Sequence, residues 1–216
     1  MDKAEPVKRP YYAPRRAAAA AQTRRAILDA AKRQLEGRGW NGATIRTIAA
    51  EAEVSPKTIE ALFSSKTALL AEVVDYTFRG GEPETPVSSG ESGRAVEEAP
   101  DVATMLERYA DHVVAINERA ARIVSVVETA AEGDEQAGAL WARMLHNRRS
   151  GARWAAEALL AKPDVPDGVA AEDVERIFLV GLNAVTYRTL VDELGLSAAA
   201  ARDWLHEYYR RMLRLA

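Results

Sequence analysis

Apolar residues recur every three or four positions along most of this chain, which is the spacing that places side chains on one face of an α-helix. The first such helix is expected from about Gln22 to Gly37, and further short helices follow as far as about Phe78. The pattern stops over residues 79–100, which are rich in Gly, Pro, Ser and Glu, and resumes behind Asp101. The regular alternation of apolar and polar positions that marks β-strands is missing, so we predict an all-α fold.

The interruption indicates how the chain is divided. We predict a flexible basic arm over residues 1–21, a helical unit over 22–78, a linker over 79–100 and a helical body over 101–216. In the body, separate helices are expected directly behind Asp101, around Ile123 to Gly133, and from about Glu135 to Ala161. A strongly apolar helix is expected from Ala171 to Leu194, and a last helix follows the capping residue Ser197.

The most informative segment is TIRTIAAEAEVSPKTIEALF, residues 44–63, which predicts two short helices joined by a tight turn. Thr44 and Ser55 each precede a helix and can accept hydrogen bonds from its free backbone N–H groups. Pro56 fits the first helical position, and the second helix leaves Lys57, Thr58, Glu60 and Ala61 facing outward. Proteins use this arrangement to place an exposed helix in the major groove of DNA. The same pattern also fits an ordinary helical hairpin inside an all-α core.

The distribution of charge favours DNA binding. The first 78 of the 216 residues carry 13 Lys or Arg and 9 Asp or Glu, whereas residues 79–216 carry 16 and 23. Residues 1–25 alone have 7 basic and 2 acidic side chains, so the net charge of −3 conceals a basic N-terminal end. A basic end attached to an acidic body suits a protein that meets a polyphosphate on one side only.

Several other functions lack the residues that they need. The chain has no cysteine, which excludes disulfides and thiolate metal sites. It has no apolar run of the roughly 20 residues that cross a membrane, and no hydrophobic signal region. No Gly-rich phosphate loop, HExxH motif or nucleophile elbow is present, and His112, His146 and His206 have no carboxylate at metal-ligand spacing. We therefore expect a soluble cytoplasmic protein with no catalytic residues, cofactor or metal.

Residues 23–75 resemble the DNA-binding domain of the TetR/AcrR family of transcriptional regulators. The resemblance rests on TRRAILDAA from residue 23, on the approach from Gly39-Trp40 to Thr44, on IAAEAEVS, and on FSSKTALL at 63–70. The remainder resembles the family only in its helical layout, a ligand-sensing bundle followed by two final helices that pair with a second subunit. The resemblance therefore implies a helix-turn-helix DNA-binding domain over 22–78 and a ligand-binding and dimerisation domain over 101–216.

Two positions depart from the family pattern. The turn usually reads Ala-Gly-Val and here reads Ala52-Glu53-Val54, which implies an altered turn or mild strain because glycine commonly relieves a left-handed backbone. Glu60 stands where the family usually has a tyrosine that touches the DNA backbone, a contact that a carboxylate cannot make favourably. Glu60 can instead accept a hydrogen bond from a cytosine N4 amine, or it can point away from the DNA.

The candidate DNA-binding residues fall into three groups. Phosphates can dock at the helix N-termini marked by Thr44, Ser55 and Lys66, and Lys66 has no evident role in the core. The second of the two short helices is the recognition helix. The residues that it can present to base edges or adjacent phosphates are Pro56, Lys57, Thr58 and Glu60. Weaker contacts to the DNA backbone are expected from Arg46 and Thr47, and contacts to the minor groove from Arg24, Arg25 and the arginines of the arm.

In the body, some side chains combine apolar bulk with a polar edge, the mixture that a ligand pocket needs. These are Tyr109, His112, Trp141, His146, Trp154, Asn183 and Tyr187, although each of them also fits an ordinary core position. A helix that is apolar on nearly all sides needs burial on all sides, which a contact between two subunits supplies. The expected dimer-interface residues are Phe178, Leu182, Val185, Leu190, Trp204 and Tyr208.

Together, the pattern and the resemblance predict a homodimeric, sequence-specific DNA-binding transcriptional regulator. We expect a repressor that a small-molecule effector releases from a palindromic operator in double-stranded DNA, with no membrane contact. A regulator without an effector, or an activator, is an alternative that a uniformly filled bundle would favour. A further alternative is an all-α small-molecule-binding or interaction protein whose helix-turn-helix no longer binds DNA, which Glu53 and Glu60 make conceivable.

Overall fold

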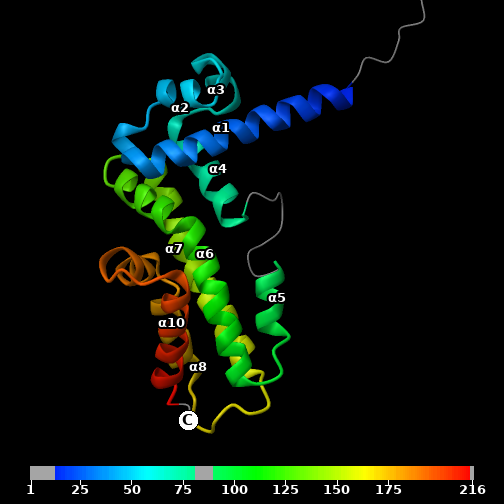
Figure 1. The fold of residues 1–216 in the computed structure, drawn as a ribbon, viewed down its shortest axis with the longest axis vertical. Helices are drawn as coiled ribbons and strands as arrows, with labels where there is room; N and C mark the ends of the chain where they lie inside the picture. Colours follow the sequence, from blue (N-terminus) through cyan, green and yellow to red (C-terminus); the bar gives the residue numbers. More distant parts are fainter. Residues whose placement is uncertain (1–12, 81–89, 215–216) are drawn as a thin grey trace, which may run out of the picture.

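The computed structural model describes residues 13–80 and 90–214, and most of these residues are helical (Figure 1). No β-strand occurs within these two ranges, in agreement with the predicted all-α fold. The N-terminal helices form a separate unit at one end of an elongated helical body (Figure 1).

The N-terminal unit consists of α1 (Ala13–Gly42), α2 (Ile45–Glu51), α3 (Pro56–Leu62) and α4 (Lys66–Phe78). The two short helices begin where predicted, because the side chains of Thr44 and Ser55 each accept a hydrogen bond from a backbone N–H of the first turn. Ile48 and Ile59 are fully buried and hold α2 and α3 on the unit. The helix-turn-helix predicted from the sequence is therefore present.

α1 begins at Ala13, well before the predicted start near Gln22. Alanine has the highest helix propensity, so the alanines at 17–21 favour continuation of the helix even though they are exposed. The prediction of a flexible arm is therefore wrong for residues 13–21, and its first 12 residues lie outside the described residues. At the other end, Gly39 has a φ of 68° and interrupts the helix close to its predicted stop.

The body contains α5 (Glu91–Glu97), α6 (Val102–Ala131), α7 (Glu135–Leu160), α8 (Ala171–Gly181), α9 (Ala184–Arg188), a π-helical turn (Thr189–Glu193) and α10 (Ala198–Met212). The bounds of α7 agree with the prediction, and Ser197 caps α10 as expected. Part of the predicted linker is helical, because α5 buries Val96 completely against the core of the body. The linker residues 81–89 lie outside the described residues.

Two other helix predictions in the body are wrong. α6 is one helix where two were expected, because Ala120 and Ala121 are buried and keep the intervening turn packed. Conversely, the helix expected from Ala171 to Leu194 breaks after Gly181. Asn183 there leaves the helical conformation (φ −71°, ψ 129°), and its side chain caps α9. The break brings α9 into contact with α6.

Two hydrophobic cores meet along α6. The first joins the N-terminal unit to the C-terminal half of α6 and the beginning of α7, through residues such as Ile123, Val127 and Leu140. The second lies between the N-terminal half of α6 and α7, α8 and α10, and includes Tyr109 and Phe178. α6 therefore links the packing of the N-terminal unit to the packing of the body.

Candidate nucleic-acid interface and internal cavity

The outer face of α3 carries polar side chains that packing inside the unit does not require. Lys57 and Glu60 are exposed, and neither forms an ion pair or hydrogen bond with another described residue. Thr58 is half-buried and its backbone N–H donates to the Oγ of Ser55 at 3.1 Å. Beside this face, an open groove between α1 and α3 is lined by Ala20, Thr23, Ser55, Lys57, Thr58, Ala61 and Leu62.

The predicted contact residues of α2 and the helix starts are also accessible. Thr44, Arg46, Ser55 and Pro56 are exposed, and Thr47 is half-buried. Thr44 and Thr47 form a reciprocal cap, in which each backbone N–H donates to the other residue's hydroxyl at 3.1 and 3.0 Å. The structure thus presents these residues on the surface of the helix-turn-helix, while their contacts with DNA stay a prediction.

The turn between α2 and α3 adopts a left-handed conformation without a glycine. Glu53 has a φ of 55°, the region in which an L-residue crowds its own carbonyl. The strain inferred from the sequence is therefore located at this residue.

We expect Glu53→Gly to raise the free energy of unfolding by about 0.5–1 kcal/mol, because glycine adopts a positive φ without steric cost but loses more backbone entropy on folding. Thermal unfolding followed by circular dichroism should show a midpoint about 2–3 °C higher. Glu53→Ala removes the same carboxylate but keeps the strain, so it should give no such gain. An equal gain from the alanine variant would attribute the effect to charge instead.

Lys66 has a structural role that the sequence did not reveal. Its Nζ lies 3.9 Å from the ring centroid of Trp40 and donates a hydrogen bond to the Trp40 carbonyl. Burial lowers the pKa of this lysine. The side chain therefore ties the start of α4 to the end of α1, and the inference that it has no role in packing is wrong.

Arg24 is likewise used inside the unit. It forms an ion pair with Glu72 of α4 and lies 4.7 Å from the centroid of the Phe63 ring. Arg25 is exposed, and it lies near Tyr76, whose pKa is raised by burial and by its hydrogen bond to Asp29, with Arg25 opposing this rise. The contacts of Arg24 hold its side chain against α4, so the structure offers no support for the predicted contact of Arg24 with the minor groove.

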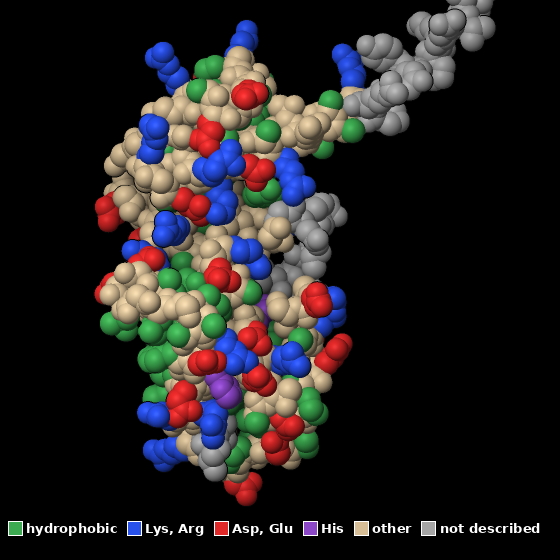
Figure 2. Space-filling model, in the orientation of Figure 1, with side chains coloured by type: hydrophobic (Ala, Val, Ile, Leu, Met, Phe, Trp, Pro, Cys, Tyr) green, Lys and Arg blue, Asp and Glu red, His purple; other side chains and the backbone are tan. Residues whose placement is uncertain are grey.

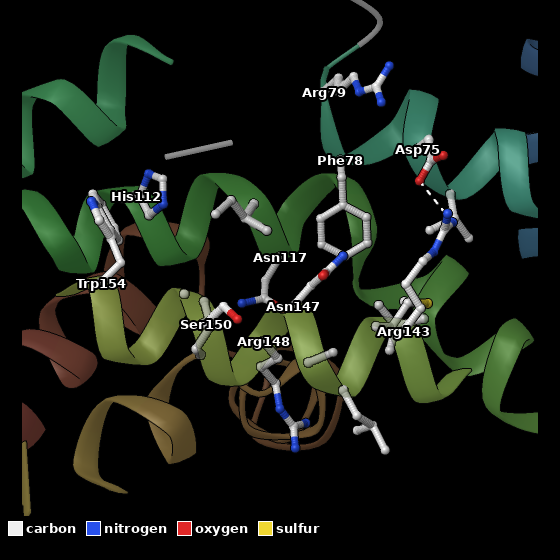
Figure 3. Close-up of a pocket in the computed structure, with 18 of the residues that line it drawn as sticks. Asp75, Phe78, Arg79, His112, Asn117, Arg143, Asn147, Arg148, Ser150 and Trp154 are labelled. Atoms are coloured by element: carbon white, nitrogen blue, oxygen red, sulfur yellow. Dashed lines mark hydrogen bonds and ion pairs between the residues drawn. The ribbon is translucent and has the colours of Figure 1, made fainter. Parts of the chain in front are cut away.

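A cavity of about 620 Å³ lies between α4, α6 and α7 and extends to the α8–α9 junction (Figure 3). Its apolar wall is formed by Val74, Phe78, Tyr109, Ile116, Val124, Trp141, Met144, Leu145, Gly151, Trp154, Leu182 and Ala184. Its polar wall is formed by Asp75, Arg79, His112, Asn117, Arg143, Asn147, Arg148 and Ser150. The volume and the mixed lining are typical of sites for small molecules.

The cavity brings together four of the seven predicted pocket residues, namely Tyr109, His112, Trp141 and Trp154. The other three lie elsewhere: His146 is exposed on α7, Asn183 caps α9, and Tyr187 is buried in the core of the body. Sequence reasoning missed Asn117, Asn147, Arg148 and Ser150. Helical spacing could have identified two of them, because Asn147 and Ser150 precede the predicted pocket residue Trp154 at intervals of three and four residues, on one face of α7.

Two polar contacts at the cavity connect different helices. Asp75 of α4 and Arg143 of α7 form an ion pair at 3.1 Å (Figure 3). His112 lies with its Nδ1 2.9 Å from the Oγ of Ser92 on α5. Burial, and secondarily the charge of Arg119, lowers the pKa of His112 to about 4, so its ring is neutral at pH 7. The first contact joins the N-terminal unit directly to the wall of the cavity.

The predicted dimer-interface residues separate into two groups. Phe178 and Leu190 are buried within the subunit, and Leu182 is half-buried in the cavity wall, so the prediction that Phe178 and Leu190 face a second subunit is wrong. Phe178 packs instead against Tyr109 and Tyr209, with ring centroids 4.5 and 5.2 Å away.

The second group is exposed on the helices at the end of the chain. Val185 is 54% exposed and Trp204 is 44% exposed, and the Trp204 ring stacks on the half-buried ring of Tyr208 at 5.5 Å. Val180 and Met212 are also exposed apolar residues of α8 and α10. Figure 2 shows hydrophobic side chains along the left edge of the body, over the region of α8 to α10 in Figure 1.

Residues 13–80 and 90–214 contain no group of three His, Asp or Glu side chains that could hold a metal ion. None of the helices in these ranges has the length and apolar character of a membrane span.

Comparison with known proteins gives a family for the N-terminal unit. Residues 27–73 match the family model described as "Bacterial regulatory proteins, tetR family". None of the curated proteins compared with this chain matches it.

Solved structures match over most of the chain, although their sequences are distant. A TetR-family transcriptional regulator from Rhodococcus sp. is 18% identical, with a TM-score of 0.63 over 89% of this chain and 99% of that one. A transcriptional regulator from Saccharomonospora viridis in complex with choline is 18% identical, with a TM-score of 0.67 over 87% of this chain and 95% of that one. FadR from Bacillus subtilis in complex with stearoyl-CoA is 11% identical, with a TM-score of 0.65 over 85% of this chain and 96% of that one.

Proposed function

We propose that this chain, whose residues 27–73 match the tetR family of bacterial regulatory proteins, is a homodimeric repressor of transcription. Each subunit inserts α3 into a major groove of a palindromic operator, with the two grooves one DNA turn, about 34–36 Å, apart. A small-molecule effector bound in the body releases the repressor. The observation that carries this proposal is the outer face of α3, where Lys57 and Glu60 are exposed and form no ion pair or hydrogen bond with another described residue.

The residues around α3 fall into those that can position the protein on the phosphates and those that can read the bases. Thr44 and Ser55 stand at helix starts, where backbone N–H groups and hydroxyls can hold phosphates. Lys57 can donate to guanine O6 or N7, and Glu60 can accept from a cytosine amine. The α1 segment that borders the groove beside α3 adds a second wall that a DNA strand can follow.

The cavity supports the effector part of the proposal. Val74, Asp75 and Phe78 of α4 form part of its wall, so a bound molecule touches the DNA-binding domain directly. Structural neighbours hold choline and stearoyl-CoA, which supports a small-molecule site in this fold. An effector can displace the DNA only by binding more tightly to the conformation that does not fit the operator.

Fluorescence anisotropy against DNA from upstream of the gene for this chain tests the proposal. We expect sequence-specific binding whose affinity falls steeply between about 50 and 200 mM salt, because binding releases counterions from the phosphates. Lys57→Ala should weaken binding about tenfold and relax the sequence preference, since an exposed lysine on the reading face is lost.

The matched control is Arg108→Ala, which removes an exposed positive charge from α6, at the end of the body far from α3. It should leave the affinity and the salt dependence unchanged. Binding without sequence preference and with only a shallow salt dependence would contradict the proposal. It would favour a small-molecule-binding protein with a degenerate helix-turn-helix.

A further inference from the structure

The cavity wall has an unequal distribution of charge. Asp75 is its only carboxylate, and this group is already paired with Arg143 at 3.1 Å. Arg79 is exposed, and Figure 3 shows it pointing away from Asn117 and Asn147. Of the arginines in the wall that form no ion pair, Arg148 is the half-buried one.

Arg148 lies half-buried in the wall and forms no ion pair with another described residue. Its Nε is buried and has no hydrogen-bond acceptor, and no carboxylate of a described residue lies within ion-pair distance of its guanidinium. The cost of removing this charge from water, and secondarily the charge of Arg149, lowers its pKa, and the carboxylate of Glu128 opposes this shift only in part. A half-buried guanidinium without an anion is costly, so a negatively charged group beside it is stabilising.

A second unpartnered polar group faces the same space. Asn117 is only 4% exposed, and its Nδ2 donates to the carbonyl of Val113 at 3.0 Å. Its Oδ1 accepts no hydrogen bond from a described residue. Figure 3 shows this amide on the side of α6 that faces Ser150 of α7, with Asn147 nearby and pointing toward Phe78. These groups can hydrogen-bond a neutral polar atom in the middle of a ligand.

The remaining wall requires an apolar ligand body. Phe78, Trp141 and Trp154 supply aromatic surface, and Ile116 and Met144 supply aliphatic surface. Figure 3 shows Arg148 extending to one side of α7 and Asn147 to the other. A ligand that contacts both sides therefore carries its charge near Arg148 and its apolar part near Phe78.

We propose that the effector is an amphipathic organic anion, whose negative group pairs with Arg148 and whose apolar body packs on Phe78 and the two tryptophans. This inference rests on the proposed role of the cavity as the effector site. It disfavours a quaternary ammonium ligand, since aromatic rings alone face such a cation and no free carboxylate balances it.

Two dyes with a nearly identical apolar body test the sign of the charge. Anilinonaphthalene sulfonate is anionic, and N-phenylnaphthylamine lacks the sulfonate. Titration of the intact protein with each dye, followed by fluorescence, should show about tenfold tighter binding of the sulfonate. Arg148→Met keeps the length of the side chain and removes its charge, so it should abolish this preference while leaving binding of the neutral dye unchanged.

Three comparisons make the result decisive. Arg153 lies on the same helix, pairs with Glu175 and does not line the cavity. Arg153→Met should therefore keep the preference for the anionic dye. Ser150→Trp, with its fold checked by circular dichroism, should weaken both dyes by filling the cavity. No binding, equal binding of both dyes in the wild-type protein, a preference that survives in Arg148→Met, or unchanged binding in Ser150→Trp would overturn the inference. DNA binding of the wild-type protein, measured without dye, keeps this outcome separate from failure of the proposed function.

Discussion

Gly181→Ala is expected to destabilise the protein by about 2–3 kcal/mol, through overpacking where α8 meets α10. A Cβ at this position would overlap the hydroxyl of Tyr209 and lie 2.7 Å from its Cζ. Tyr209 is fully buried between the rings of Tyr109, Phe178 and Tyr208, so its ring has no free space into which to move. Denaturant unfolding at a fixed protein concentration measures the effect, since association of subunits also contributes to stability.

Two variants separate the overlap from a general effect of alanine. Gly138→Ala lies on α7 with no atom within 4 Å of the added Cβ, so it should stabilise by about 0.5–1 kcal/mol through helix propensity. Tyr209→Phe removes a buried hydroxyl that has no hydrogen-bond partner, so its cost alone should be small. Combined with Gly181→Ala, it should recover part of the lost stability. Full stability of Gly181→Ala alone would contradict the packing described here.

The starts of α2 and α3 were predictable because the signals that set them are local. Thr44 and Ser55 each accept a hydrogen bond from a backbone N–H three residues later, so the residue type and its distance from the apolar stripe were enough. The family resemblance identified Glu53 as the unusual residue of the turn, because the glycine usual at this position is missing, and Glu53 does adopt a positive φ.

Contacts between distant segments were not predictable in this way. The pairing of Lys66 with Trp40 depends on how α1 and α4 pack, and the burial of Phe178 depends on the approach of Tyr109 and Tyr209 from other helices. α5 was interpreted as linker because its short sequence has weak periodicity, and the burial of Val96 outweighs that local preference. For the cavity, aromatic residues were identified by type, whereas the roles of Asn117 and Arg148 depend on which of their polar atoms the fold leaves without a partner.

We expect Trp204→Glu to convert the proposed dimer to a monomer. Trp204 and Tyr208 form an exposed aromatic stack on α10, and Val185 and Val180 expose further apolar surface on the neighbouring segments. Apolar patches of this kind on a soluble domain mark contact surfaces, and a carboxylate placed at the centre of such a contact would be buried without a partner. Size-exclusion chromatography with light scattering should therefore report half the mass of the wild-type assembly, with the helical circular dichroism retained.

The same variant links subunit association to DNA binding. A palindromic operator binds two α3 helices at once, so a monomer should lose the gain from simultaneous engagement, about 10²–10⁴-fold in affinity. Ala103→Glu adds the same charge at an exposed position of α6 and should leave both the dimer and the operator affinity intact. A Trp204→Glu protein that stays dimeric would place the subunit contact elsewhere. A monomer that keeps full operator affinity would contradict binding by paired reading helices, because each α3 would then act alone.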